Sequence, residues 1–324
     1  MSTIDRREFM RRTAAGVAAG LGNNVLAAEN TSSPPSTRPA SGRILRATDV
    51  ITLGKTGINP SRLSFGTGSR GEQTKLGIDD FAKLLRYAKD KGIYWWDSAD
   101  LYGTHPHVAA ALKEIKRDEV VILSKTQSKD AAGVRKDIER FLKELNTDYI
   151  DIVLLHCMSD DEWPTKMGGP MDVLSEAKDK GLVRAVGSSL HVQGKLGPVK
   201  LLPLKAAANL SWGDVHMVRI NPFAQSMDVN KTKYIPQLEE VFRAMHKRSK
   251  GLYGMKLLGG NNTDDRRALF QGDKIDKSLR FALTRDYIAG FTIGMVSEKE
   301  VDDIIQRIER LAVPAPKQVK GVVS

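Results

Sequence analysis

Eight short apolar runs alternate with amphipathic stretches along most of this chain, and they limit its fold more than any other feature. The runs begin roughly 27–38 residues apart. They are Leu63–Thr67, Ile93–Asp97, Val120–Lys125, Ile150–His156, Val183–Gly187, Val215–Ile220, Gly251–Lys256 and Ala289–Gly294. Continuous apolar runs of this length are typical of parallel strands buried on both faces. Eight of them, each followed by a helical pattern, predict an α/β fold consisting of a single (β/α)8 TIM barrel.

The helical pattern is clearest where apolar residues recur on one face, as at Phe81, Leu84, Leu85 and Ala88. It is weakest at 193–212, where Pro198 and Pro203 interrupt the expected fifth helix. No linker divides the eight units, so we expect one barrel domain over residues 49–315 and a short tail at 316–324. The segment 54–57 (Gly-Lys-Thr-Gly) predicts a turn between two extended strands ahead of the barrel.

The N-terminal segment has the pattern of an export signal. Arg6-Arg7 is followed by Phe9, and 13–21 consists mostly of small uncharged residues. Val25-Leu26-Ala27 offers a cleavage site, so residues 1–28 are interpreted as a twin-arginine signal peptide. Residues 29–48, rich in Ser, Thr and Pro towards their start, are predicted to be a flexible linker. We therefore expect a periplasmic or otherwise exported protein whose partners include the twin-arginine export machinery.

Other sequence features narrow the classes of function. The apolar part of the signal is too short for stable membrane insertion. The formal net charge of +11 comes from scattered basic residues, and no nucleic-acid-binding motif is present. Cys157 is the only cysteine, so no intrachain disulfide is possible. His105 and His107 have no nearby Cys or carboxylate at metal-ligand spacing, and we expect no metal.

Polar residues end three consecutive apolar runs. Asp97, Lys125 and His156 occupy these ends, and Tyr102 follows shortly after Asp97. In a parallel barrel the carboxyl ends of the strands meet at one mouth, where such folds carry out their chemistry. Lys125 would lower the pKa of Tyr102, Asp97 would hold Lys125, and His156 would orient a carbonyl group. A different chemistry is also open, in which Lys125 forms a Schiff base in a lyase or isomerase.

These residues resemble the aldo-keto reductase family. Its members carry an Asp, a Tyr-Gly pair, a Lys and a His in this order, matched here by Asp97, Tyr102-Gly103, Lys125 and His156. The resemblance runs from about Ile51 to about Leu311 and suggests a divergent bacterial branch. It implies that the N-terminal hairpin plugs the bottom of the barrel. It also implies that Tyr102 is the general acid in reduction of an aldehyde or ketone by a nicotinamide cofactor.

The resemblance extends to residues that would bind this cofactor. A Rossmann G-x-G-x-x-G motif after a strand is absent, and the family lays its dinucleotide across the barrel mouth instead. The implied contacts are Gly66, Thr67, Asp97, Ser188, Ser189, Met217, Met255, Lys256, Leu258, Gly259, Gly294, Ser297 and Glu300. Ser189, Met217 and Met255 depart from the commoner family residues and bear on how the nicotinamide ring is held.

The choice of dinucleotide depends on the last helix. Ser297 and Lys299 resemble residues that hold the 2′-phosphate of NADP, whereas Glu300 stands where many members have an Arg. Ser297 and Glu300 also match a helix capping box. The family resemblance favours NADP(H), with NAD(H) as the alternative. A third class of function remains open, a sensor barrel that binds the dinucleotide with little turnover.

Overall fold

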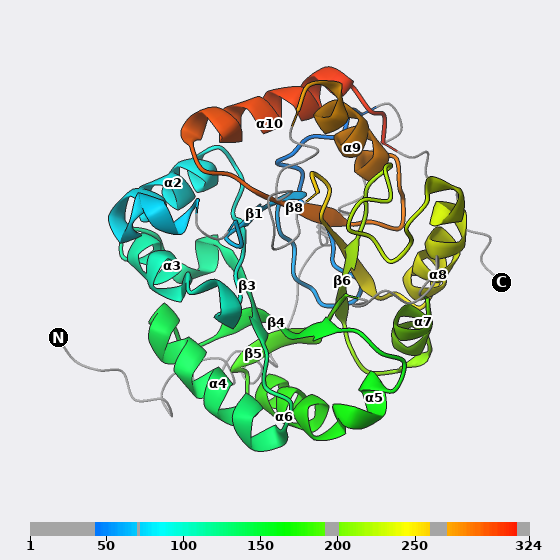
Figure 1. Cartoon of the computed structure of the whole chain (residues 1–324). Helices are drawn as coiled ribbons and strands as arrows, with labels where there is room; N and C mark the ends of the chain where they lie inside the picture. Colours follow the sequence, from blue (N-terminus) through cyan, green and yellow to red (C-terminus); the bar gives the residue numbers. More distant parts are fainter. Residues whose placement is uncertain (1–42, 70–71, 192–200, 260–270, 316–324) are drawn as a thin grey trace, which may run out of the picture. The chain divides into compact units, whose positions relative to one another are not determined.

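The computed structural model describes residues 43–69, 72–191, 201–259 and 271–315. Contacts between Cα atoms divide the chain into Met1–Ser36 and Thr37–Ser324. The predicted signal peptide and most of the predicted linker lie outside the described residues, as does the predicted tail. Within the second unit, Figure 1 shows helices surrounding a central set of strands. None of the described helices combines the length and apolar character needed to span a membrane.

The described strands form a closed barrel in the order β1 to β8, and every neighbouring pair is parallel. They are β1 (Leu63–Gly66), β2 (Trp95–Asp97), β3 (Val121–Thr126), β4 (Ile150–Met158), β5 (Val183–Leu190), β6 (Val215–Arg219), β7 (Gly251–Met255) and β8 (Gly290–Gly294). Gly66 is in register with Asp97 of β2 and with Gly294 of β8, which closes the ring. The predicted (β/α)8 barrel is confirmed, and each strand overlaps its predicted apolar run.

Helices cover the outer face of the strands (Figure 1). They are α2 (Ile78–Asp90), α3 (His105–Leu112), α4 (Ala131–Leu145), α5 (Trp163–Lys166), α6 (Gly168–Asp179), α7 (Leu202–Asn209), α8 (Ile235–Lys247), α9 (Asp273–Leu283) and α10 (Glu298–Leu311). Short 3-10 turns are η1 (Thr74–Leu76), η2 (Asp100–Tyr102), η3 (Arg117–Glu119) and η4 (Thr232–Tyr234). Pro203 lies in the first turn of α7, where proline is tolerated, whereas Pro198 lies outside the described residues.

The amphipathic helices show how the sequence encodes the outer layer. In α4, Val134, Ile138, Phe141 and Leu145 are buried against the strands, as their spacing predicts. The helix begins where the side chain of Asp130 accepts a hydrogen bond from the N–H of Gly133 at 2.8 Å. Such a cap satisfies one of the free N–H groups at a helix start and contributes about 1 kcal/mol.

A second apolar cluster fills the lumen of the barrel. It includes Trp95, Leu123, Leu154, Met217 and Tyr253. The N-terminal hairpin supplies further members, because Ile51, Leu53 and Ile58 belong to the same cluster. The hairpin is held by bonds from the N–H of Ile51 to Pro60 O at 2.9 Å and from the N–H of Leu53 to Ile58 O at 3.4 Å. The expected hairpin therefore contributes its apolar side chains to the lumen.

The end of the predicted linker differs from the structure. Leu45 and Ala47 are buried in the outer core. The N–H of Leu45 donates to Val313 O at 2.9 Å, and the N–H of Ala315 donates to Arg43 O at 2.8 Å. Residues 43–48 are thus part of the barrel domain, because their apolar side chains and main-chain groups find partners there. The polar composition that predicts a flexible linker ends near residue 42, ahead of these apolar residues.

Candidate active site

Alternation along the strands explains why four polar side chains face the lumen. Successive side chains of a strand point to opposite faces, so residues two apart share a face. Trp95, Leu123 and Leu154 belong to the lumen cluster. Asp97, Lys125 and His156 lie two residues further along the same strands, at the carboxyl ends of β2, β3 and β4. The Arg219 side chain reaches the same end of the barrel, two residues after Met217 of the lumen cluster.

Lys125 is the centre of this group. The Lys125 side chain is completely buried, and its ammonium group forms an ion pair with Asp97 Oδ1. It also donates to the main-chain oxygen of Ser98 at 2.7 Å. Burial acts to lower the pKa of Lys125, but the negative charge of Asp97 and the phenol of Tyr102 act against it, and the net direction is upward. Lys125 therefore carries a firmly held proton.

Asp97 has a second partner that the sequence interpretation missed. The hydroxyl of Tyr253, in β7, donates to Asp97 Oδ2 at 3.1 Å. The ring of Tyr253 packs on Trp95, with 4.1 Å between the ring centroids. Burial raises the pKa of Tyr253 well above its ordinary value, so this hydroxyl stays protonated as a donor. Each oxygen of the Asp97 carboxylate thus accepts a hydrogen bond. The sequence signal for this partner was the position of Tyr253, two residues after the start of an apolar run.

Tyr102 reaches the ion pair from the turn η2. Its hydroxyl lies 3.5 Å from Lys125 Nζ, and Lys125 Nζ lies 4.8 Å from the centre of the Tyr102 ring. The His156 ring packs edge-on against the Tyr102 ring, with 5.8 Å between centroids and an angle of 83°. The four predicted residues, here called the tetrad, therefore meet at one end of the barrel, carried by β2, β3, β4 and the turn η2.

The acidity of Tyr102 differs from the expectation. Burial raises the pKa of Tyr102, and the negative charge of Asp97 acts in the same direction. The ammonium of Lys125 lowers this pKa, as expected, but its contribution is outweighed. The expected net lowering of the Tyr102 pKa is therefore wrong for this structure. The negative charge of Asp97 opposes that of Lys125, and burial disfavours the phenolate. At neutral pH Tyr102 carries its proton.

Other cationic groups surround the same mouth. Arg219 is buried and bonds Asp228 through Nη2 and Oδ1 at 2.5 Å. Lys256 follows β7 in the left-handed backbone region, at φ 61°. Burial lowers the pKa of Lys256, and the charge of Arg219 lowers it further. The same two causes, together with the charge of Lys256, place the pKa of His191 well below its usual range. Sequence reasoning did not single out Arg219 or His191.

Cys157 lies beside the tetrad in a strained position. It follows His156 with φ at 63°, where the pairing of β4 with β5 shifts register. The N–H of Cys157 donates to Ser189 Oγ at 2.9 Å. Burial raises the pKa of the thiol. At neutral pH Cys157 is therefore a protonated thiol, and Ser189 keeps its own hydroxyl proton to donate.

The residues implied for the cofactor lie at the same ends of the strands and differ in their contacts with the rest of the protein. Thr67 follows β1, and its N–H and hydroxyl both donate to the main-chain oxygen of Asp97, at 2.8 and 3.1 Å. Met217 and Met255 belong to the lumen cluster. The Ser188 side chain is bonded to His216 Nδ1 at 2.9 Å. Leu258 and Gly259 follow Lys256 after β7, and the continuation at 260–270 lies outside the described residues.

The start of α10 forms the cap that the sequence allowed. Ser297 Oγ accepts from the N–H of Glu300 at 3.3 Å, and Glu300 Oε2 accepts from the N–H of Val296 at 2.9 Å. Gly294 ends β8 directly before this segment. The carboxylate of Glu300 thus occupies an N–H group at a helix start that would otherwise attract an anion.

His105 and His107, the two histidines near Tyr102, have protein partners. His105 bonds Glu144 and Ser124, and the His107 ring packs against Phe81, with 5.4 Å between centroids. Across the described ranges, no three His, Cys, Asp or Glu side chains are grouped so that they could hold a metal ion.

With this geometry established, comparison with known proteins identifies the family. The family model "Aldo/keto reductase family" matches residues 62–261. The chain belongs to the aldo-keto reductase family. The match includes all four tetrad residues and the strands from β1 to β7.

Individual aldo-keto reductases are similar over part or most of the chain. YhdN of Bacillus subtilis is 32% identical over 160 residues, which cover 44% of this chain and 46% of that protein. The NADH-specific methylglyoxal reductase of Escherichia coli is 26% identical, over 43% of this chain and 51% of that protein. These matches therefore span about half the length of each relative. L-galactose dehydrogenase of Arabidopsis thaliana is 21% identical over 81% of this chain and 89% of that protein.

Solved structures of aldo-keto reductases share the fold. A Pseudomonas aeruginosa protein assigned to this family aligns with a TM-score of 0.66 and 24% identity, covering 83% of this chain and 98% of that one. The holo form of an aldo-keto reductase from Bacillus halodurans aligns with a TM-score of 0.59 and 20% identity, covering 83% and 97%. At these identities the likeness establishes the barrel fold alone.

Proposed function

We propose that this protein is an NAD(P)H-dependent reductase of aldehydes or ketones in which Tyr102 is the general acid. The observation that carries the proposal is the convergence of Tyr102, Lys125, Asp97 and His156 at one mouth of the barrel. Family membership supports the same chemistry. The names of relatives such as the E. coli methylglyoxal reductase point to small carbonyl compounds as the class of substrate.

The tetrad assigns a task to each residue. Tyr102, protonated at neutral pH, donates its phenolic proton to the carbonyl oxygen of the substrate as the carbon is reduced. Lys125, 3.5 Å away, stabilises the phenolate left behind. Asp97, which also accepts a hydrogen bond from Tyr253, holds Lys125 in place. His156, edge-on to Tyr102, would donate to the same carbonyl oxygen and set its orientation.

The residues at the mouth fit a nicotinamide dinucleotide. Ser189 Oγ accepts from the N–H of Cys157, so its hydroxyl proton is available for a carboxamide oxygen. Lys256 follows β7 and would offer its side chain to a pyrophosphate, whose negative charge would favour the protonated amine. When bound, the reduced cofactor would supply the hydride, which side chains cannot provide. Family membership supports NADP(H), which we propose as the cofactor. The capping role of Glu300 supports the alternative, NAD(H).

The structure disfavours the alternative in which Lys125 forms a Schiff base. A Schiff-base lysine needs a neutral amine and therefore a lowered pKa. The pKa of Lys125 is raised, and its ammonium is held by Asp97 and Ser98. The sensor barrel with little turnover has no observation in its favour beyond the dinucleotide residues that both functions share.

Replacement of Tyr102 by Phe tests the proposal. We expect Tyr102→Phe to lower kcat for carbonyl reduction by roughly 10²–10⁴-fold, the usual range for loss of a general acid. Dinucleotide affinity, measured by quenching of protein fluorescence, should stay within a few-fold, because the ring and its contact with His156 remain. A variant that keeps most of its turnover would remove Tyr102 as the acid. A wild type that binds dinucleotide but reduces no carbonyl would favour the sensor.

We also propose that the protein is exported through the twin-arginine pathway. The support is the sequence of residues 1–28, with Arg6-Arg7 followed by small residues and a cleavage site. Export in the folded state suits an enzyme that acquires a nucleotide cofactor in the cytoplasm.

A further inference from the structure

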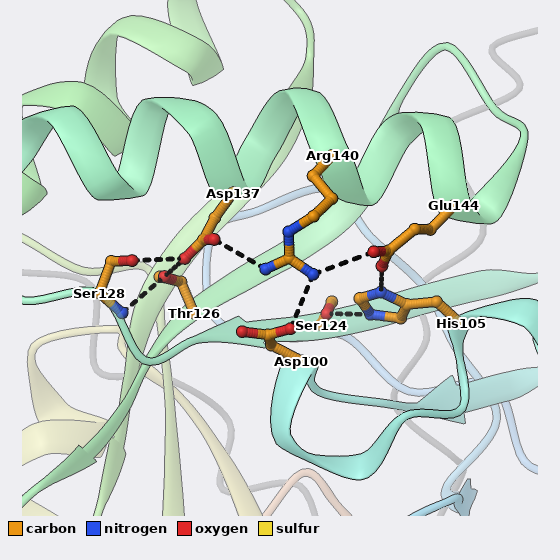
Figure 2. A network of polar contacts seen from close by, with 8 residues as sticks. All are labelled: Asp100, His105, Ser124, Thr126, Ser128, Asp137, Arg140 and Glu144. Atoms are coloured by element: carbon orange, nitrogen blue, oxygen red, sulfur yellow. Dashed lines mark hydrogen bonds and ion pairs between the residues drawn. The ribbon is translucent and has the colours of Figure 1, made fainter.

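Polar side chains hold β3 from its outer face on both sides of Lys125. Ser124 and Thr126 point away from the lumen because they alternate with Lys125. Both are buried. Ser124 Oγ bonds His105 Nε2 at 2.8 Å, and the hydroxyl of Thr126 donates to Asp137 Oδ2 at 2.5 Å. The segment that carries Lys125 is therefore fixed by a polar network on the far side of the sheet (Figure 2).

The same network reaches the turn that carries Tyr102. Figure 2 shows the Arg140 guanidinium, on α4, between three carboxylates. Nη1 donates to Asp100 Oδ1 at 2.8 Å and to Glu144 Oε1 at 3.0 Å, and Nη2 donates to Asp137 Oδ1 at 2.8 Å. Asp100 is the first residue of η2, which ends at Tyr102. These bonds raise the pKa of Arg140, that to Asp100 most of all. Arg140 thus links the tyrosine turn to α4.

His105 provides a second link, from the other side of Tyr102. Burial lowers the pKa of His105 even though Glu144 acts to raise it. His105 is therefore neutral at neutral pH, with one donor and one acceptor nitrogen. Both contacts are satisfied if Nδ1–H donates to Glu144, at 2.7 Å, and Nε2 accepts from the hydroxyl of Ser124. The chain is tied down before Tyr102 at Asp100 and after it at His105.

External support of this kind matters because η2 has few bonds of its own. The turn contains the N–H of Tyr102 bonded to Ala99 O at 3.0 Å and the N–H of Gly103 bonded to Asp100 O at 3.2 Å. A three-residue 3-10 turn has weak hydrogen-bond geometry and little intrinsic stability. The distance of 3.5 Å from Lys125 Nζ to the Tyr102 hydroxyl is at the long end for a hydrogen bond. A small outward shift of η2 would end this contact.

We propose that Arg140 is a positioning residue which, through Asp100, holds the Tyr102 turn against β3 and fixes the separation of Tyr102 from Lys125. This inference rests on the proposed role of Tyr102 and adds a group from the outer face of the barrel. The Arg140 side chain is 42% exposed, and exposed ion pairs contribute little to global stability. Loss of Arg140 should therefore alter the site more than the fold.

The test compares Arg140→Gln with Arg135→Gln. Arg135 lies on the same helix and pairs with Glu176 at 2.8 Å, with a side chain 51% exposed, but it has no bond to η2. We expect Arg140→Gln to lower kcat roughly 3- to 30-fold, less than the roughly 100-fold that a full 1 Å misplacement can cost, with dinucleotide affinity unchanged. Arg135→Gln should keep wild-type kcat. Asp100→Asn should reproduce Arg140→Gln, and the double variant should be no worse than either single one.

The pH profile separates positioning from general support of the fold. In the reverse reaction, alcohol oxidation, the rate rises with pH as Tyr102 loses its proton. Displacing Tyr102 changes its burial and its distances from Asp97 and Lys125, which together set its pKa. The alkaline limb of the pH–rate profile should therefore move in Arg140→Gln and stay in place in Arg135→Gln. A lower melting temperature with an unmoved limb would overturn the proposal, as would identical behaviour of the two variants.

A measurement without turnover keeps this proposal separate from the proposed function. The ultraviolet difference titration between wild type and Tyr102→Phe reports ionisation of the Tyr102 phenol directly. Arg140→Gln should shift this pKa, and Arg135→Gln should not, even if no carbonyl substrate is turned over. An unmoved phenol titration would overturn the positioning role, whereas full turnover by Tyr102→Phe would overturn the proposed function alone.

Discussion

Replacing Lys125 by Met tests whether the lumen holds a true ion pair. The Lys125 ammonium is completely buried and has three donor hydrogens, which are directed at Asp97, Ser98 and Tyr102. Met is similar in length and apolar, so little cavity remains. The change leaves Asp97, itself buried, with the hydroxyl of Tyr253 as its remaining described partner. Breaking a buried pair by removing one partner costs about 3–5 kcal/mol. We expect Lys125→Met to lower the free energy of unfolding by that amount.

The double variant Asp97→Asn/Lys125→Met identifies the source of the loss. It removes the buried charge together with its partner, and an Asn amide oxygen can still accept from Tyr253. We expect it to recover about 2 kcal/mol relative to Lys125→Met, because an uncompensated charge no longer has to be buried. Denaturant titration followed by tryptophan fluorescence measures both variants, since Trp95 packs directly on Tyr253.

The pH dependence has a definite sign. The pKa of Lys125 is raised in the folded state, so the folded protein holds this proton more tightly than the unfolded chain. The stabilisation is fully present below the ordinary lysine value of about 10.4 and is lost as pH rises through the raised value. The loss of unfolding free energy in Lys125→Met, relative to wild type, should therefore be constant around neutrality and become smaller only in strong alkali. A single variant within about 1 kcal/mol of wild type would refute the buried pair, and a double variant as unstable as the single one would assign the loss to packing.

Two further predictions concern the ends of the chain. Glu300→Arg should raise the affinity for NADPH relative to NADH by roughly 5–100-fold, because a carboxylate is exchanged for a cation near the expected 2′-phosphate. Fluorescence quenching with both dinucleotides measures this, and Glu298→Arg is the control because Glu298 is exposed in the same helical turn. An equal affinity ratio in both variants would limit Glu300 to capping. Replacing Arg6 and Arg7 by Lys should retain the precursor in the cytoplasm, as fractionation and N-terminal sequencing would show, and unchanged export would contradict the signal assignment.

The barrel and its tetrad could be predicted because each depends on a local pattern. A run of buried residues that ends in Asp97, Lys125 or His156 places that residue at a strand end, and the parallel topology then brings the ends together. The order of the runs also sets the order of the strands. The position of the candidate site could thus be predicted without knowing any side-chain contact.

Contacts between distant segments could not be predicted in this way. The bond from Arg140 to Asp100 joins a partly exposed helix residue to a turn. The bond between His105 and Ser124 joins the start of α3 to a buried strand. Asp137, Arg140 and Glu144 share one helical face by their spacing, which was the available signal. The direction of the Tyr102 pKa shift could not be predicted for a related reason. Its direction depends on how much burial and Asp97 oppose Lys125, and a sequence fixes neither quantity.

Closure of the barrel has a consequence for when the chain can fold during its synthesis. β1 pairs with β8, and the main chain at Arg43 and Leu45 bonds Val313 and Ala315. The first strand therefore waits for a partner that is synthesised after all the other strands of the barrel, and pairings so far apart in sequence form slowly. A nascent chain with its signal already exposed would still have an open sheet edge. Export of a folded enzyme, as proposed, then requires that the signal be withheld from the export machinery until the ribosome has released the last strand.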